Sequence, residues 1–246
     1  MKKSSFILCF LIGFSIFFSN SFGLENNKNE ELKFNKKILY IGIPAIALSF
    51  LADKEVEDFI KSNQTETLDD IGSTFSSFAP QYLVLAGALG YVYGYFTKNE
   101  KFAYASQLSV ESSIIAASIV LPIKLIVGRK RPEDTDKIMD FGYHDFDASF
   151  PSGHTAVAFA FFGTYASIYN KGITPYLLYS IPVLVGFGRI YEDKHYFSDV
   201  VAGAVIGLSS IYLGKLLHNR ITTRFQFGIE FEISKKKFGT KVSYNF

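Results

Sequence analysis

The chain has 246 residues, which is enough for one large domain, and its one cysteine excludes a disulfide within the chain. The formal net charge of +2 gives no indication of a nucleic-acid partner, and none is expected. Hydrophobic residues make up 48% of the sequence and aromatic residues 17%, which favours a membrane protein in which polar segments separate apolar ones.

Residues 1–23 have the pattern of a secretory signal peptide. Two lysines precede an apolar run over residues 6–18, and small residues follow at Ser21 and Gly23, where cleavage is expected. This apolar run is shorter than the ~20 residues that a spanning helix needs. An uncleaved membrane anchor is the alternative interpretation.

Residues 24–78 are expected to lead into the main bundle. Their apolar part, residues 38–52, is too short as a helix to cross a hydrocarbon core of ~30 Å, so we expect an interfacial or partly inserted helix. Residues 53–78 are rich in acidic side chains, and we expect a solvated, partly amphipathic segment there. The acidic residues are Asp53, Glu55, Glu57, Asp58, Glu66, Asp69 and Asp70.

Five apolar segments follow and predict an all-α fold, a membrane-embedded helical bundle of five to six helices over residues 79–220. Each segment is about 16 to 20 residues long and rich in Ala, Gly and Ser, which permits close helix packing in lipid. We expect five spanning helices. The segments cover residues 79–96, 108–127, 154–169, 175–190 and 200–217.

The tail, residues 221–246, alternates polar and apolar side chains and predicts a short C-terminal β-hairpin with its turn at residues 235–237. The terminal Phe246 is also typical of the last strand of an outer-membrane barrel. Two strands cannot close a barrel, so the hairpin is the preferred interpretation.

The stretch Pro-Ser-Gly-His at residues 151–154 lies where a polar loop over residues 129–149 meets an apolar segment, so it predicts the start of a helix. The unpaired N–H groups and the dipole of a helix start favour an anion, above all a phosphate. His154 falls in the first turn, where its ring can exchange a proton with a bound group. A helix cap with a solvent-facing histidine is the alternative for this stretch alone.

Two further stretches add chemistry to this end of the bundle. Lys124 and Arg131 are separated by about two helical turns and can point to the same end. His195 and Asp199 are spaced i,i+4, so a helix at this point lets Asp199 accept from one ring nitrogen and leaves the other free to attack. Together with Arg189, these residues supply the charge clamps and the nucleophile that phosphoryl transfer needs.

The chain resembles the type 2 phosphatidic acid phosphatase (PAP2) superfamily of lipid phosphatases, whose pattern is K-x6-RP, then PSGH, then SR-x5-H-x3-D. Residues 124–132, 151–154 and 188–199 match these motifs in order and with the correct spacing. The helical pattern extends the resemblance over roughly residues 38–220. Gly188 departs from the family, which usually has Ser there; the change spares the nucleophile but can remove one polar contact.

The resemblance implies a metal-free phosphatase that needs no cofactor and acts through a phosphohistidine. In this scheme His195 attacks phosphorus, Asp199 holds the tautomer of His195, and His154 protonates the leaving oxygen and then activates water. Cations and backbone N–H groups at the helix start bind the non-bridging oxygens. These phosphate-binding residues are Lys124, Arg131, Ser152, Gly153 and Arg189, with the N–H of His154.

The resemblance also implies a lipid phosphate or pyrophosphate as substrate and a place in a membrane, for which we expect the bacterial inner membrane. Basic residues gather in the segments opposite the motifs, so by the positive-inside rule the motif side faces the periplasm or the exterior. These basic residues are Lys98, Lys101, Lys171, Arg220 and Arg224.

Three alternatives stay open. A soluble periplasmic non-specific acid phosphatase of the same superfamily also starts with a signal peptide, and a vanadate haloperoxidase shares the anion pocket. The non-enzyme alternative is a structural membrane or outer-membrane protein with relic motifs.

Overall fold

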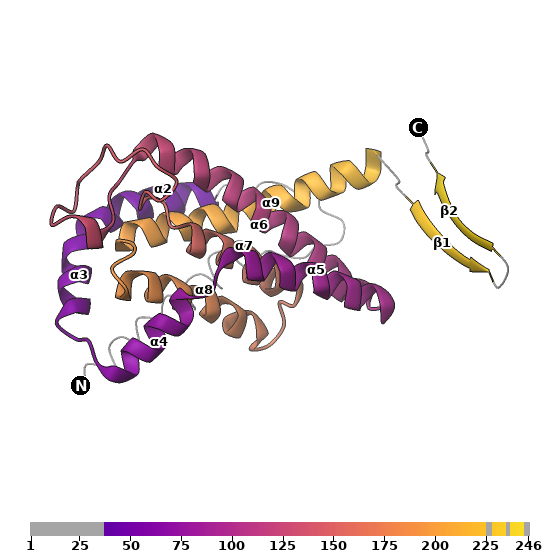
Figure 1. Cartoon of the computed structure of the whole chain (residues 1–246), viewed down its shortest axis with the longest axis horizontal. Coiled ribbons are helices and arrows are strands. Elements are labelled where there is room, and N and C mark those ends of the chain that lie inside the picture. The colour runs from indigo at the N-terminus through magenta and orange to yellow at the C-terminus, as the bar shows by residue number, and fades with distance from the viewer. Residues whose placement is uncertain (1–36, 225–227, 235–236, 244–246) are drawn as a thin grey trace.

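The computed structural model of the protein describes residues 37–224, 228–234 and 237–243. The predicted signal peptide, residues 1–23, and the polar residues up to 36 lie outside this part of the chain. Helices provide the regular structure of residues 37–224 (Figure 1), as the apolar periodicity predicts.

The five predicted apolar segments each form one helix of a bundle, so the helical-bundle prediction is confirmed. The second and the fifth of these helices start three or more residues before their apolar segments, because polar residues continue the first turns. Asn99, for example, caps the second helix by accepting a hydrogen bond from the N–H of Phe102 at 3.1 Å. The helices are α5 (Pro80–Phe96), α6 (Glu100–Val127), α7 (Gly153–Ile168), α8 (Thr174–Tyr191) and α9 (Phe197–Arg224).

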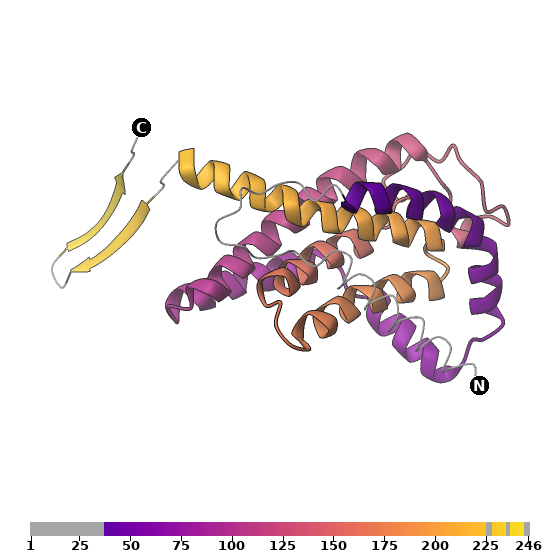
Figure 2. The ribbon, with the colours of Figure 1, turned by 180° about the vertical axis from the view of Figure 1, so that it is seen from behind.

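Helix α7 lies inside the bundle and packs against α6, α8 and α9 (Figures 1 and 2). Glycines on α9 let α7 and α9 approach each other closely. A Cβ on Gly203 would lie 2.5 Å from the carbonyl oxygen of Ser152, and one on Gly207 would lie 2.4 Å from that of Ala156. This close contact places the beginnings of α7 and α9 side by side.

An N-terminal arm precedes the bundle. It consists of α2 (Lys37–Ser49), the short 3-10 helix η1 (Phe50–Ala52), α3 (Asp53–Lys61) and α4 (Glu66–Ser76). Helix α2 packs along α9, where Ile38 joins the core, and α4 packs along α8. Figures 1 and 2 show α3 at the end of the bundle where α9 begins.

The arm corrects the interpretation of residues 53–78 as a solvated segment. Most of its acidic side chains are exposed, as expected. Asp53 and Ser76, however, are only 1% and 3% exposed. Ser76 contacts Arg189 of the predicted site, and Asp53 contacts Arg129, which in turn bonds Asp199. The arm is therefore part of the functional end of the molecule.

Two helices in the described part of the chain are long and apolar enough to cross a membrane. They are α6 and the part of α9 from Phe197 to Asn219. Helix α5 presents large exposed apolar side chains, among them Leu85, Leu89 and Phe96, which suit contact with lipid.

The tail contains two short strands, β1 (Gly228–Ser234) and β2 (Lys237–Ser243). They pair antiparallel, with Gly228 opposite Ser243 and Ser234 opposite Lys237. Residues 235–236 of the predicted turn lie outside the described residues. The hairpin as a folded part of the protein stays a prediction.

Candidate active site

The loop that follows α6 folds back over the end of that helix. Gly128 ends α6 in the left-handed conformation, with φ of 59°. Its carbonyl oxygen accepts hydrogen bonds from the N–H groups of Gly142 and Tyr143, both at 2.8 Å. This turn brings residues 147–149 back beside Lys124.

Lys124 and Arg131 meet at this loop, as their spacing predicts. The buried ammonium group of Lys124 donates to the carbonyl oxygen of Ala148. Arg131 Nε donates to the carbonyl oxygen of Asp147 at 3.0 Å, and the guanidinium also pairs with the carboxylates of Asp147 and Glu133. Both cations therefore lie at the end of the bundle where α6 ends.

The helix start predicted at residues 151–154 is confirmed: α7 begins at Gly153, and Ser152 is its extended N-cap residue. The N–H of Ser152 donates to the carbonyl oxygen of Asp199 at 3.0 Å. This bond goes against the prediction that the N–H of Ser152 binds phosphate, because that donor already joins α7 to α9. Gly153 and His154 occupy the positions whose N–H groups a helix start leaves without intrahelical partners.

Both predicted catalytic histidines face the same cations. His154 lies in the first turn of α7, and the charges that act on its ring are those of Arg189, Arg131 and Lys124. His195 lies in the turn between α8 and α9 and has Lys124 and Arg189 as charged neighbours too. The two imidazoles therefore converge on one end of the bundle.

Helix α9 begins at Phe197, so Asp199 lies in its first turn, i+4 from His195. Asp199 Oδ2 accepts a hydrogen bond from the N–H of Tyr196 at 2.8 Å and another from the hydroxyl of Ser149. His195 Nδ1 lies 3.6 Å from this carboxylate oxygen and 3.5 Å from Ser149 Oγ. Because Nδ1 is turned toward this pair, Nε2 is the ring nitrogen left to attack. Ser149 belongs to none of the three sequence motifs.

Burial decides the charge of His195, whose side chain is 2% exposed. The pKa of this imidazole is lowered to about 3, chiefly by desolvation and also by the charges of Lys124 and Arg189, against the opposing effect of Asp199. At neutral pH the ring is therefore uncharged and carries the lone pair that a nucleophile needs.

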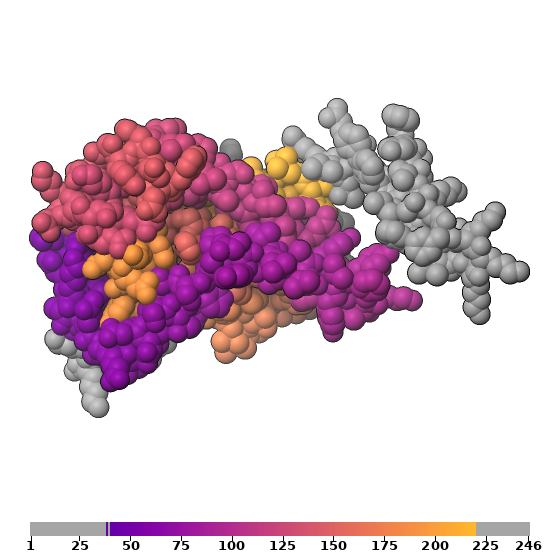
Figure 3. Space-filling view, in the orientation of Figure 1, coloured from indigo at the N-terminus to yellow at the C-terminus, as the bar shows by residue number. Residues whose placement is uncertain are grey.

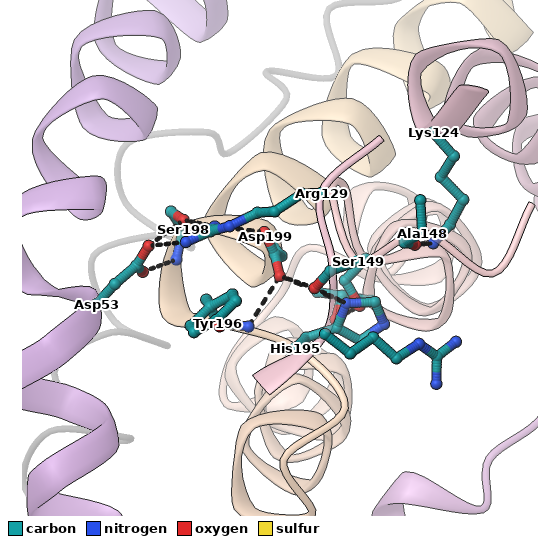
Figure 4. Close-up of polar contacts among 12 residues, drawn as sticks. Asp53, Lys124, Arg129, Ala148, Ser149, His195, Tyr196, Ser198 and Asp199 are labelled. Carbon is teal, nitrogen blue, oxygen red and sulfur yellow. Dashed lines mark hydrogen bonds and ion pairs between the residues drawn. The ribbon is translucent and has the colours of Figure 1, made fainter. Parts of the chain in front are cut away.

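A buried arginine holds the second oxygen of Asp199 (Figure 4). Arg129 Nη1 donates to Asp199 Oδ1 at 2.8 Å, and Arg129 Nη2 donates to Asp53 Oδ2 at 2.8 Å. All three side chains are 0% exposed. Ser198 closes the network, because its N–H and its hydroxyl both donate to Asp53 at 2.7 Å. The guanidinium therefore joins α3 to α9 directly behind His195.

Two aromatic rings cover the guanidinium of Arg129. Its central carbon lies 3.9 Å from the centre of the Tyr196 ring and 5.1 Å from that of the Phe50 ring. Sequence reasoning missed this network, because Asp53 is 76 positions from Arg129 and stands in a stretch that looks solvated. One available signal was the apolar stretch directly before Asp53, which can draw the carboxylate toward the core.

Arg189, in the last turn of α8, has a partly bonded guanidinium. Its Nη1 donates to Ser76 Oγ at 3.0 Å, whereas its buried Nε has no hydrogen-bond partner among the described residues. The carbonyl oxygen of Arg189 accepts a hydrogen bond from the N–H of His195 at 3.1 Å, which ties this cation to the turn that contains His195. A buried donor without a partner is a group that an anionic ligand can satisfy.

The structure thus gathers six predicted side chains at one end of the bundle, while no group of three or more His, Cys, Asp or Glu among the described residues is placed to hold a metal ion. In the space-filling view this end is framed by the loop after α6 and by the N-terminal arm (Figure 3). Cations beside a neutral imidazole and a second imidazole can bind an anion and transfer it. The six residues are Lys124, Arg131, His154, Arg189, His195 and Asp199.

Comparison with known proteins finds a family model that covers this site. The model described as "PAP2 superfamily" matches residues 108–223. A relative from Bacillus licheniformis, bacitracin transport permease protein BcrC, is 28% identical over 157 residues, which cover 58% of this chain and 73% of that protein. A lipid A 1-phosphatase from Porphyromonas gingivalis is 32% identical over 119 residues, which cover 48% of this chain and 24% of that protein.

A solved structure shares the fold. The crystal structure of the first transmembrane PAP2 type phosphatidylglycerolphosphate phosphatase from Bacillus subtilis matches with a TM-score of 0.53 at 18% identity, over 75% of this chain and 95% of that chain. The region matched by the family model contains all three motifs, whereas Asp53 and Ser76 lie before it.

We expect Arg129 to be essential for the stability of this end of the bundle. Replacing Arg129 by Met leaves Asp53 and Asp199 buried without their cation, so the free energy of unfolding should fall by about 3–5 kcal/mol, measured by denaturant unfolding in detergent. Lys130→Met is the matched control: Lys130 is a partly exposed cation paired with Asp140, and its loss should cost at most ~1 kcal/mol. Equal unfolding midpoints for R129M and the wild type would contradict the role of the network.

Proposed function

Since the PAP2 superfamily model matches residues 108–223, we propose that the chain belongs to that superfamily and hydrolyses a phosphate monoester or diphosphate carried by a membrane lipid. One observation carries the proposal: two imidazoles lie beside the same two cations, Lys124 and Arg189, at the start of a helix. A phosphoryl group in transfer requires this combination of positive charge, a nucleophile and a proton donor.

The proposed reaction has two steps. In the first, Nε2 of His195 forms a bond to phosphorus while the bond to the leaving oxygen breaks, and His154, protonated once the bound anionic substrate offsets the nearby cations, gives its proton to that oxygen. In the second, neutral His154 takes a proton from water, the water oxygen attacks phosphorus, and the bond from phosphorus to His195 breaks. Inorganic phosphate leaves, and both histidines return to their starting forms.

Asp199 and the cations stabilise charge during these steps. The phosphorylated ring of His195 is positive, and Asp199 Oδ2 faces its Nδ1 at 3.6 Å. Lys124, Arg131 and Arg189 neutralise the non-bridging oxygens of the phosphoryl group, with the N–H groups of the α7 start. Loss of one such group costs about 3–4 kcal/mol of transition-state stabilisation.

A lipid is the proposed carrier of the phosphate, because α6 and α9 are apolar and long enough to place the site at a membrane. Lipid A phosphates and phosphatidylglycerol phosphate are the first substrates to test, since the relative from P. gingivalis and the structural neighbour from B. subtilis bear those names. Phosphatidate and undecaprenyl pyrophosphate complete the panel.

The proposed setting is the bacterial inner membrane, with the site facing the periplasm. Support comes from the basic residues Lys98, Lys101 and Lys171, which lie in the segments opposite the motif end. We also retain a cleaved signal peptide and a C-terminal hairpin as parts of this proposal.

His195→Asn is expected to abolish phosphate release from every substrate of the panel, by a factor on the order of 10³ or more, because no nucleophile remains. The measurement is inorganic phosphate released in detergent micelles. His144→Asn is the matched control and should keep the wild-type rate, since His144 lies in the loop after α6, where its ring contacts the carbonyl oxygen of Leu125. Wild-type phosphate release by H195N would exclude the mechanism.

The effect of His154→Asn should depend on the leaving group. For a lipid phosphate, whose leaving oxygen needs a proton, the rate should fall by about 10²–10⁴. For p-nitrophenyl phosphate, the first step needs no proton, so a burst of nitrophenol should precede slow turnover while phosphohistidine accumulates on residue 195. Equal losses for both substrates, with no burst, would argue against His154 as the proton donor.

The orientation can be tested with an alkaline-phosphatase reporter, which is active only in the periplasm. A fusion within residues 134–147 should be active, and a fusion within residues 170–174 should be inactive, because the two loops lie at opposite ends of the bundle. The reverse pattern would overturn the proposed orientation.

A further inference from the structure

Helix α4 crosses the last turns of α8 at very short range. The crossing point has glycine on both helices, at Gly72 and Gly188. A Cβ on Gly188 would lie 2.6 Å from the carbonyl oxygen of Gly72 and 2.8 Å from the N–H nitrogen of Ser76. A Cβ on Gly72 would lie 2.6 Å from the ring of Tyr191. Neither position can take a side chain without moving the helices apart.

Polar contacts fasten the beginning of α4 to α8 as well. The hydroxyl of Tyr191 donates to the carboxylate of Asp69 and accepts from the N–H of Thr65 at 3.3 Å. The glycine crossing then fixes the end of the same helix. As a result, Ser76 is 3% exposed and its hydroxyl meets the guanidinium of Arg189, where it accepts a hydrogen bond from Nη1 at 3.0 Å.

We propose that Ser76, on α4, is a positioning residue that holds the guanidinium of Arg189. Ser76 takes this role because residue 188, which precedes Arg189, has no side chain. Gly188 stands where the PAP2 pattern has Ser, directly before Arg189. The close crossing of α4 and α8 leaves no room for a serine side chain at residue 188. The same crossing places the hydroxyl of Ser76 within hydrogen-bond distance of Arg189. This inference rests on the function proposed above and assigns part of the phosphate site to the N-terminal arm.

The arrangement prepares Arg189 for an anion. Its long side chain has several rotatable bonds, and a ligand that must order them binds more weakly. Ser76 occupies one end of the guanidinium, at Nη1, while the buried Nε stays without a partner among the described residues. The cation is thus held in place with a donor still available for a phosphate oxygen.

The test compares Ser76→Ala with the wild type. The inhibition constant of orthovanadate and the KM for a lipid phosphate should each rise about tenfold, whereas kcat should change less than about threefold, because a disordered Arg189 weakens phosphate binding before and during transfer. Ser73→Ala is the matched control, since Ser73 is exposed on the same helix and bonds only locally, to the carbonyl oxygen of Asp70. S73A should behave as the wild type.

A second variant tests the same inference from residue 188. Gly188→Ser puts back the residue that the family usually has, yet it should raise the orthovanadate constant at least as much as S76A, because the new Cβ pushes α4 and Ser76 away from Arg189. A wild-type orthovanadate constant in either S76A or G188S would overturn the inference.

Two further readouts separate the possible failures. The shift of the melting temperature by inorganic phosphate measures anion binding without catalysis, and it should be smaller in S76A than in the wild type and in S73A. If the wild type released no phosphate from any lipid of the panel, the proposed function would fail, while this shift would still decide whether Ser76 supports anion binding. S76A could instead melt at a lower temperature than the wild type without phosphate, yet show the same phosphate-induced shift. In that case the role of Ser76 would be structural only and the inference would be wrong.

Discussion

One buried guanidinium holds the catalytic end of the bundle together. Arg129 lies between the carboxylates of Asp53 and Asp199, and all three side chains are closed off from water. In such surroundings each charge is tolerated only because the others neutralise it. The orientation of Asp199, and with it the ring of His195, therefore depends on a contact that reaches from the first helices of the chain to the last.

The helices and the motif residues could be predicted because their signals are local. Apolar runs of sufficient length predict helices directly, and charged residues at the ends of those runs indicate which side chains lie close together. The beginning of α6 was missed because Glu100 and Lys101 interrupt the apolar pattern, although Asn99 is a typical cap. The role of the Ser152 N–H was misjudged because its acceptor, the carbonyl of Asp199, belongs to another helix.

The contribution of the N-terminal arm could not be read in the same way. Asp53 and Ser76 act through partners more than 70 positions away, and apart from the apolar stretch before Asp53 their neighbouring residues do not distinguish them from the exposed polar side chains around them. Gly188 was the clue for Ser76, since a missing hydroxyl in an otherwise complete motif invites a search for a substitute. The site thus consists of a helical core, which the family model matches, and of an N-terminal arm that lies before the matched region.

The reach of this network also sets the order in which the protein can become active. Asp53 and Ser198 are 145 positions apart, so their hydrogen bonds cannot form until the chain up to Ser198 has left the ribosome. Contacts of such long sequence separation are also among the slowest to form. A nascent chain that still lacks α9 has His195 but lacks Asp199, which supports its ring, and the site is completed only when α9 meets α3.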